Sequence, residues 1–379
     1  MPNTENEDHL PIETYGAIAT IDLDAIAHNY QLLCKKIAPA QCSAVVKADA
    51  YGLGAANVAH ILYKAGCRIF FVAQLNEGRD LKKVLPQDAI IAILNGLQPG
   101  SESIAAQNHL VPVLNSWDAI LRWQNLCIKR RKNFAAIIQV DTGMARLGLD
   151  AQECKFLSAN TSIFNDANIL FLMSHLASGD EKENPSNARQ LQCLKDIKST
   201  FPNCPIALSN SGGIFLEKSY YFDLVRAGIA LYGVAPNHKE KHIKPVLKLD
   251  ARVIQSRHVE KGQAIGYGGD FITKHPSTIT TIAMGYADGW HRSLGNKGSA
   301  FYAGQRLPIL GRISMDSITL DTSDLPILLK AGDLVELIGE HQSLEEVAKD
   351  AGTISYEILT SLSRRCARVY LQNGKTTRL

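Results

Sequence analysis

The sequence lacks the features that mark a membrane, secreted or nucleic-acid-binding protein. It contains no apolar run of 18 residues, and residues 1–14 are polar and acidic, unlike a signal peptide. The 40 Lys and Arg residues nearly balance the 37 Asp and Glu residues, so we expect no uniform basic surface for nucleic acid. The eight cysteines include no C-x-x-C pair and no zinc-ligand spacing, which indicates reduced thiols rather than disulfides or a metal site. These absences predict a soluble, cytoplasmic protein.

The length and the spacing of apolar runs predict a parallel barrel in the first part of the chain. A chain of 379 residues is long enough for about two domains, and 46% hydrophobic with 20% charged residues is ordinary for a globular protein. Eight short apolar runs alternate with helical stretches. The runs are Ser43–Val46, Ile69–Val72, Ile90–Leu94, Val111–Leu114, Phe134–Val140, Ile169–Met173, Ile206–Leu208 and Phe222–Val225. This alternation is typical of a (β/α)8 barrel of the TIM type, although a doubly wound sheet has the same local rhythm.

Polar and ionisable residues follow the eight runs. They are Lys47, Gln74, Asn95, Asn115, Asp141, His175, Asn210 and Arg226. A parallel barrel has its active site at the carboxyl ends of its strands. The positions of these residues therefore favour a barrel and predict a functional site at that face.

The chain changes character near Ile243. From there onward β-branched, glycine-punctuated and mostly alternating segments dominate, and only residues 343–351 and 355–363 are predicted to be helical. We therefore expect a barrel over residues 15–243 and a mainly β domain over residues 244–379, joined by a linker at Pro236–Ile243. The N-terminal segment is a candidate to pack on the second domain.

Lys47 lies at the mouth of the first long buried strand, within the segment Ser43–Gly54. A lysine in this position is usually a solvated strand end, but desolvation in a barrel mouth lowers a lysine pKa and suits imine formation with an aldehyde cofactor. The segments Ser209–Gly213 and Arg226–Ala230 follow the seventh and eighth runs, where barrels commonly bind phosphate, although each alone is an ordinary turn. The combination suggests pyridoxal 5'-phosphate (PLP) held as a Schiff base.

Four further segments carry candidate residues that also have ordinary structural explanations. They are Asp141–Gly148 with Arg146, the single residue His175, Gly285–Trp290 with Tyr286, and Gly311–Asp316 with Met315. Taken singly, the first is typical of a turn, the second of a core histidine, the third of a loop and the fourth of a strand with a polar face.

Taken together, these residues resemble the alanine racemases, PLP-dependent enzymes built from an N-terminal barrel and a C-terminal β domain. The resemblance extends from Ile18–Tyr30 to Ser355–Leu359, nearly the whole chain. It is carried by the order of the motifs Val-Lys-Ala-x-Ala-Tyr-Gly, Asp-Thr-Gly-Met, Gly-Tyr-Ala-Asp-Gly and Met-Asp. It implies an amino-acid racemase that interconverts L-alanine and D-alanine, supplies D-alanine for peptidoglycan, and works as a homodimer with active sites shared between its subunits.

The resemblance also implies a role for each matching residue. Lys47 would hold the cofactor as a Schiff base and act as one catalytic base, and Tyr286, reaching in from the partner, would be the base on the opposite face of the substrate α-carbon. The cofactor-binding residues would be Lys47, Tyr51, Arg146, His175, Asn210, Ser211, Arg226, Gly228, Ile229 and Tyr356. Of these, the phosphate would be held by Tyr51, Ser211, Gly228, Ile229 and Tyr356. Substrate would be bound by Arg146 and by the backbone N–H of Met315.

The chemistry of racemisation explains these residue types. A proton must leave one face of the α-carbon and return to the other, so two bases must flank a planar carbanion. Arg226 would hydrogen-bond the pyridine nitrogen, and because an arginine is effectively always protonated, that nitrogen must stay unprotonated. The cofactor ring is then a weaker electron sink, which should discourage decarboxylation and transamination.

Three positions depart from the pattern of the family. Gln139 stands where many members have a lysine that is carbamylated and pairs with the following arginine. Here Arg146 must be oriented otherwise, by Gln139 itself or by a bound anion such as chloride. Leu53 replaces a histidine and Ser314 replaces a cysteine, and we expect both changes to tune the site rather than abolish it.

Other functions remain as alternatives. A racemase of broader specificity, or one acting on serine or a basic amino acid, would have nearly the same sequence motifs. A non-catalytic PLP-binding barrel would not need the β domain that carries Tyr286 and Met315. A PLP-dependent decarboxylase would be expected to have a carboxylate in place of Arg226, and a nucleotide-binding barrel would leave Lys47 unexplained.

Overall fold

A computed structural model of the chain describes residues 10–236 and 242–377. Their elements divide into two compact units, one formed by Leu23–Lys244 and the other by Met1–Asp22 together with Pro245–Leu379. Most of the expected linker, residues 237–241, lies outside the described residues. Within the described ranges, no helix is both long enough and apolar enough to cross a membrane.

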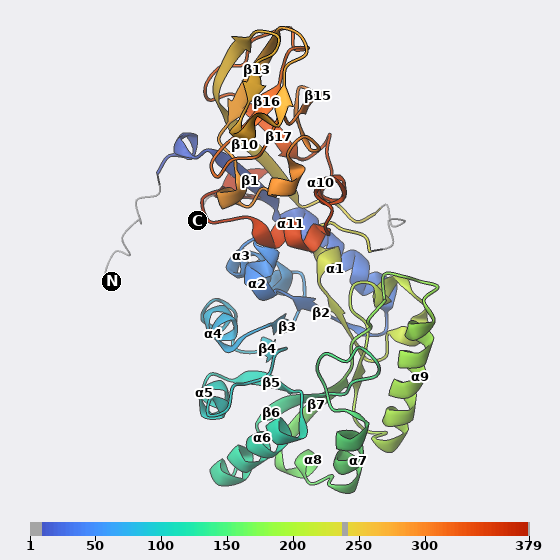
Figure 1. Cartoon of the computed structure of the whole chain (residues 1–379). Coiled ribbons are helices and arrows are strands. Elements are labelled where there is room, and N and C mark those ends of the chain that lie inside the picture. Colours follow the sequence, from blue (N-terminus) through green and yellow to red (C-terminus); the bar gives the residue numbers. More distant parts are fainter. Residues whose placement is uncertain (1–9, 237–241, 378–379) are drawn as a thin grey trace, which may run out of the picture. The chain divides into compact units, whose positions relative to one another are not determined.

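The first unit is a closed barrel of parallel strands (Figure 1). The strands are β2 (Gln41–Val45), β3 (Ile69–Val72), β4 (Ile90–Ile93), β5 (Leu110–Leu114), β6 (Ala135–Gln139), β7 (Asn168–Met173), β8 (Ile206–Ala207) and β9 (Leu224–Ala227). They pair in chain order, and β9 pairs with β2 to close the barrel, with Ser43 opposite Arg226. The predicted fold class is confirmed, and each of the eight apolar runs overlaps one strand.

Burial on both faces explains why these strands are continuous apolar runs rather than alternating ones. Every residue of β3 and of β5 is buried. One face of a barrel strand packs into the interior and the other packs under the surrounding helices, so both faces need apolar side chains. The polar residues that follow the strands are therefore confined to the rim.

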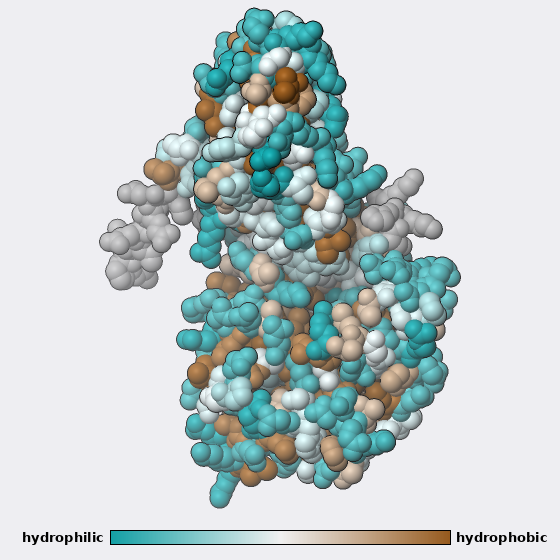
Figure 2. Space-filling model, viewed as in Figure 1, coloured by the Kyte–Doolittle hydropathy of each residue, from teal (hydrophilic) through white to brown (hydrophobic). Residues whose placement is uncertain are grey.

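Helices surround the barrel strands in Figure 1. They are α1 (Leu23–Ile37), α2 (Lys47–Tyr51), α3 (Ala55–Lys64), α4 (Leu75–Val84), α5 (Glu102–Gln107), α6 (Trp117–Arg130), α7 (Ala151–Ala159), α8 (Ile163–Asp166) and α9 (Pro185–Thr200). Hydrophilic side chains predominate on the face of this unit that Figure 2 shows. This distribution is expected where each helix buries an apolar stripe against the strands and exposes its polar face.

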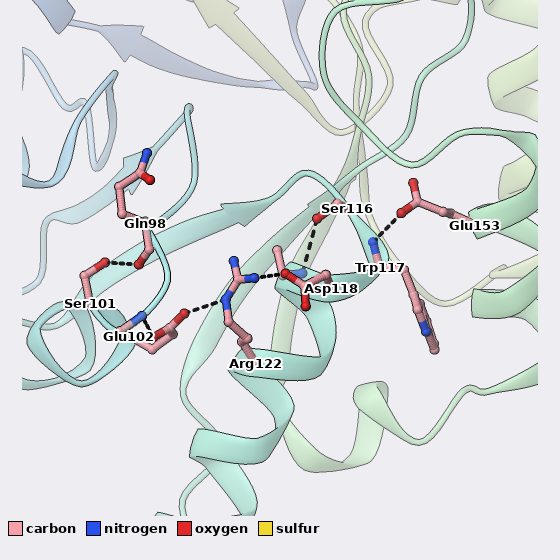
Figure 3. Close-up of polar contacts among 10 residues, drawn as sticks. Gln98, Ser101, Glu102, Ser116, Trp117, Asp118, Arg122 and Glu153 are labelled. Carbon is pink, nitrogen blue, oxygen red and sulfur yellow. Dashed lines mark hydrogen bonds and ion pairs between the residues drawn. The ribbon is translucent and has the colours of Figure 1, made fainter.

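Polar contacts join neighbouring outer helices (Figure 3). On α6, Arg122 pairs with Glu102 of α5 at 2.7 Å and with Asp118 one turn earlier on its own helix. The backbone N–H of Trp117, at the start of α6, donates to the Glu153 carboxylate of α7 at 2.7 Å. These contacts fix the helices in sequence around the barrel.

The second unit is mainly β, as predicted. Its strands are β1 (Ala17–Asp22), β10 (Leu247–Val259), β11 (Ala264–Ile265), β12 (Phe271–Ile272), β13 (Ser277–Ile282), β14 (Ser299–Tyr302), β15 (Gln305–Pro308), β16 (Ile318–Asp321), β17 (Leu334–Ile338), β18 (Ala367–Gln372) and β19 (Lys375–Thr377). Its helices are α10 (Leu344–Ala351) and α11 (Ser355–Ser361). The long strand β10 pairs with β1, β13 and β17, and so organises the main sheet.

Strand β1 belongs to the second unit, whereas the expected domain boundary at residue 15 grouped it with the barrel. It pairs antiparallel with β10, with Ala17 opposite Ala251, and parallel with β18, with Ile18 opposite Ala367. A strand with partners on both sides buries its backbone hydrogen-bonding groups in the sheet to which those partners belong. Strand β1 therefore lies in the sheet of the second unit, and the barrel unit begins with α1.

Candidate active site

Lys47 follows β2 and is the first residue of the short element α2. The rest of α2 is a left-handed turn. The next four residues, Ala48 to Tyr51, have φ angles of 52°, 54°, 52° and 58°. Consecutive left-handed conformations are unfavourable for L-residues other than glycine, at about 1–2 kcal/mol each, and persist only where surrounding contacts hold them. Within the turn, the N–H of Gly52 donates to the Ala48 carbonyl at 2.8 Å. The turn therefore fixes the backbone positions of Lys47 at its start and Tyr51 at its end.

The surroundings of Lys47 favour its neutral amine. Its pKa is lowered mainly by burial and further by the positive charge of Arg146, while the carboxylate of Glu77 acts in the opposite direction. Burial disfavours the charged form of any amine, so at neutral pH more of such a lysine is in the neutral form that can act as a nucleophile or accept a proton. Lys47 therefore has the electrostatic environment that imine chemistry requires.

Arg226 is buried at the end of β9. Its guanidinium donates to the carbonyls of Ser174 at 2.7 Å and of Ala207 and Leu208 at 3.1 Å each, and to Nδ1 of His175 at 3.1 Å. Burial lowers its pKa to about 9, which is still above neutral pH, so the group stays charged. All four contacts use the two terminal nitrogens, and none of them uses the Nε–H.

His175 is held in its neutral form. Burial, and then the charges of Arg226, Arg146 and Lys47, lower its pKa to about 3. Because Arg226 donates to Nδ1, we assign the ring proton to Nε2. The Nδ2 of Asn210 lies 3.3 Å from Nε2, but both groups are then N–H donors, and the Asn210 amide donates instead to the Leu176 carbonyl at 3.3 Å.

A small, polar cradle lies between the loop after β8 and the start of the turn after β9. The Ser211 hydroxyl accepts from the backbone N–H groups of Gly228 at 2.8 Å and Ala230 at 3.3 Å. A Cβ at Gly228 would lie only 2.7 Å from the Tyr51 hydroxyl, so only glycine allows the backbone to approach this closely. Ile229, the next residue, is buried and begins a single 3-10 turn that continues to Tyr232.

These features fit the predicted cofactor. Hydroxyls and backbone N–H groups around a glycine are the donors that bind phosphate at this end of a barrel. Arg226 retains an Nε–H that can face a ring nitrogen, and the half-buried Lys47 can bond to an aldehyde. The barrel unit thus brings together Lys47, Tyr51, His175, Asn210, Ser211, Arg226, Gly228 and Ile229.

Arg146 lies on a loop that the protein fixes through its backbone. The Asp141 carboxylate accepts from the N–H groups of Gly143 at 2.8 Å and Met144 at 2.9 Å. The side chain of Gln139 donates to the carbonyl of Leu147 at 3.0 Å. Gln139 therefore holds the backbone beside Arg146 and does not bond to the guanidinium itself, which is exposed.

The other three predicted site residues belong to the second unit, and all three side chains are partly exposed: Tyr286 by 44%, Met315 by 52% and Tyr356 by 40%. Tyr286 and Met315 lie on adjacent segments, because the Tyr286 N–H donates to the Ser314 carbonyl at 3.1 Å and the Ala287 N–H donates to the Met315 carbonyl at 3.0 Å. The barrel by itself contains none of the three.

An ionic clamp joins the two segments that carry Tyr286 and Met315. The buried carboxylate of Asp288 accepts from the Gly285 N–H at 2.8 Å and pairs with Arg365 at 3.1 Å. Arg365 also pairs with Asp316 at 2.7 Å. One guanidinium therefore contacts Asp288, two residues after Tyr286, and Asp316, the residue after Met315.

Sequence reasoning missed two residues that support the site. Gln190 on α9 donates to the His175 carbonyl at 2.8 Å and accepts from the Ala177 N–H at 2.9 Å. No local sequence pattern indicated this role. Glu77 contacts the turn after Lys47, and its only signal was the Gln74-x-x-Glu77 spacing of a helix capping box.

Two family models together match almost all of the chain. The model described as "Alanine racemase, N-terminal domain" matches residues 21–236, and the model described as "Alanine racemase, C-terminal domain" matches residues 246–370. The chain is also 53% identical to the alanine racemase of Brucella ovis over 393 aligned positions, covering 100% of this chain and 98% of that one. It is 50% identical to the catabolic alanine racemase of Agrobacterium fabrum, covering 94% and 92%.

Solved structures agree with these similarities. The crystal structure of alanine racemase from Bartonella henselae with covalently bound pyridoxal phosphate has a TM-score of 0.92 and 52% identity, covering 94% of this chain and 99% of that one. The biosynthetic alanine racemase from Pseudomonas aeruginosa has a TM-score of 0.87 and 32% identity, covering 95% and 100%.

Proposed function

The chain belongs to the alanine racemase family, and from that premise we propose which of its residues carry out the reaction. It is a PLP-dependent isomerase that interconverts L-alanine and D-alanine. The observation that most directly supports the assignment of residues is the buried, charged Arg226 bonded to a neutral His175 at the mouth that holds Lys47. PLP, when bound, supplies an electron sink for the negative charge left at the substrate α-carbon.

Lys47 holds the cofactor and exchanges a proton at one face of the α-carbon. Its lowered pKa supports this role, because a neutral Nζ is available at lower pH than for an exposed lysine. The hydroxyls of Tyr51 and Ser211 and the backbone around Gly228 and Ile229 bind the phosphate, with Asn210 ordering the neighbouring loop through the Gly213 N–H at 3.0 Å. Tyr356 completes the phosphate site.

Arg226 restricts the reaction to racemisation. Its charged guanidinium donates a hydrogen bond to the ring nitrogen, which therefore stays unprotonated and withdraws electrons less strongly. His175 accepts from Arg226 and adds no positive charge of its own, since its low pKa keeps it neutral. This arrangement favours simple proton return over bond cleavage elsewhere on the substrate.

Tyr286 exchanges the proton at the opposite face of the α-carbon. The Met315 N–H binds the substrate carboxylate, and Arg146 binds the phenolic oxygen of the cofactor. We place Tyr286 and Met315 of one copy beside the barrel of a second copy, in a homodimer with shared sites. Their partly exposed side chains on adjoining, clamped segments support this arrangement. We further propose a cytoplasmic location, consistent with eight free cysteines, and use of the D-alanine in peptidoglycan.

Proton NMR in D2O tests the assignment of the two bases. The wild-type enzyme should exchange the α-proton of either enantiomer of alanine. Lys47→Ala should abolish racemisation and covalent cofactor attachment, measured by mass spectrometry after borohydride reduction. Tyr286→Phe should retain the attached cofactor and lose exchange from one enantiomer selectively. Equal exchange from both enantiomers in Tyr286→Phe, or full activity in Lys47→Ala, would contradict the assignment. A panel of L-amino acids in the same assay distinguishes an alanine-selective enzyme from a broad-specificity one.

A further inference from the structure

Glu77 binds three backbone N–H groups from two strand ends. Its Oε2 accepts from Ala73 at 2.7 Å and from Gln74 at 2.9 Å, just before its own helix α4. Its Oε1 accepts from Ala48 at 2.7 Å. The first two contacts cap α4 and are local, whereas the third crosses from the end of β3 to the residue after Lys47.

The third contact, with the N–H of Ala48, is made at the start of the left-handed turn. Ala48 is the first of the four left-handed residues between Lys47 and Gly52. Because each such residue is intrinsically unfavourable, an interaction that fixes the first N–H stabilises the whole turn, together with the turn's own backbone hydrogen bonds. A carboxylate is suited to this task, since hydrogen bonds to a charged acceptor are about twice as strong as neutral ones.

The charge of Glu77 acts on the same lysine. Burial and Arg146 both lower the pKa of Lys47, and the carboxylate of Glu77 raises it. His175, whose pKa the charge of Lys47 helps to lower, is neutral. Glu77 is therefore the anion that opposes the effect of Arg146 on Lys47, in addition to being a hydrogen-bond acceptor.

We propose that Glu77 is a positioning residue for the racemisation. Its carboxylate holds the left-handed turn after β2, and through that turn it sets Lys47 at the cofactor aldehyde and Tyr51 at the phosphate. The proposal rests on the functions proposed above for Lys47 and Tyr51. It concerns a side chain that contacts neither cofactor nor substrate in that scheme.

Glu153 provides a matched control in the same barrel. It also completes a capping box, accepting from the Asp150 N–H at 3.2 Å, and it also crosses to a neighbouring element, accepting from the Trp117 N–H at 2.7 Å (Figure 3). This second contact, however, is to the start of α6 rather than to the turn after Lys47. Glu77→Gln and Glu153→Gln therefore remove the same kind of interaction at two places.

The test compares these variants in four measurements on the full-length holoenzyme and apoenzyme. They are the PLP dissociation constant, kcat and KM for alanine, the pH titration of the absorbance of the bound cofactor, and the melting temperature. An amide in place of the carboxylate turns one acceptor into a donor that faces a backbone N–H. We expect Glu77→Gln to weaken PLP binding by about tenfold or more, to lower kcat more than it raises KM, and to move the absorbance titration to lower pH. Glu153→Gln should lower the melting temperature and leave the other three unchanged.

A second variant keeps the proposal falsifiable if Glu77→Gln folds poorly. Glycine adopts positive φ readily, so Ala48→Gly should make the turn depend less on Glu77. The effect of Glu77→Gln on PLP binding should then be smaller in the Ala48→Gly background, as a double-mutant cycle measures. Additive effects, a Glu77→Gln variant that matches Glu153→Gln, or an unfolded Glu77→Gln that Ala48→Gly does not restore would overturn the proposal. Failure of the Lys47 assignment is distinguishable, because it would appear as retained covalent cofactor in Lys47→Ala.

Discussion

A mixed dimer gives the sharpest test of a shared active site. Lys47 belongs to the barrel unit and Tyr286 to the other unit of the same chain. If each site takes its lysine from one copy and its tyrosine from the other, a dimer of one Lys47→Ala subunit and one Tyr286→Phe subunit has one site with both residues intact. The second site of that dimer lacks both. If each site were built from one chain, neither site of the mixed dimer would be intact.

The expected magnitude follows from this count of sites. Each parent homodimer should be inactive, and the purified mixed dimer should have about half of the wild-type kcat per dimer, because one site of two is complete in a twofold assembly. The KM of that site should equal the wild-type value. Neither substitution should unfold the chain, since Tyr286→Phe removes only a hydroxyl from a side chain that is 44% exposed.

The assay uses two differently tagged chains, co-expressed and purified through both tags in turn. Racemisation is followed by chiral analysis of D-alanine formed from L-alanine, with PLP added to saturation. Activity near half of wild type supports the shared site. A mixed dimer as inactive as its parents would refute it, and so would full activity of the wild-type enzyme as a monomer.

Three further results are expected. Gly228→Ala puts a Cβ 2.7 Å from the Tyr51 hydroxyl and should weaken PLP binding by about 5- to 100-fold, measured by equilibrium dialysis. In a Tyr51→Phe background that hydroxyl is gone, so a similar loss of PLP affinity there would contradict the reasoning. His175 titrates at about pH 3 in the folded chain and near its ordinary 6.5 when unfolded, so the unfolded state binds the extra proton between these values. The free energy of unfolding should therefore fall as pH drops below about 6.5, by up to about 1.4 kcal/mol per pH unit. Chemical denaturation of His175→Gln should show a smaller pH dependence of this free energy. An unchanged dependence would count against a buried neutral histidine. Bicarbonate should leave activity unchanged in steady-state assays, because Gln139 has no amine to carbamylate, and activation by bicarbonate would require another residue in that role.

Local sequence patterns predicted the eight strands, and the polar residues after them favoured a barrel over a doubly wound sheet. Each strand is short and buried on both faces, so its sequence is an uninterrupted apolar run. For the strand Ile69–Val72 the predicted and observed bounds are identical. The polar residue after each run marks the catalytic rim for the same reason, since the rim is where burial ends. The helix Leu344–Ala351 is likewise predictable, because Ser343 and Glu346 form a capping box at its start.

The membership of β1 was not predictable from its own residues. Alternation from Ile18 to Leu23 predicts a strand, but it carries no information about the strand's neighbours. Its partners Ala251 and Ala367 lie more than 200 residues away, and only the folded chain selects them. The boundary between the two units therefore depends on pairing rather than on local propensity.

The candidate site divides in the same way. Lys47, Arg226 and Tyr286 are prominent in the sequence because a motif, a strand end or a family pattern marks each one. The sequence by itself determined the order of the strands and helices and the chemical type of each side chain at the rim, because both follow from local periodicity and burial. Only the tertiary structure decided that Arg226 meets His175, that Gln139 bonds to the backbone at Leu147, and that Glu77 holds a left-handed turn. The Arg226 and Glu77 bonds join the ends of different strands, and folding of the barrel brings these partners together.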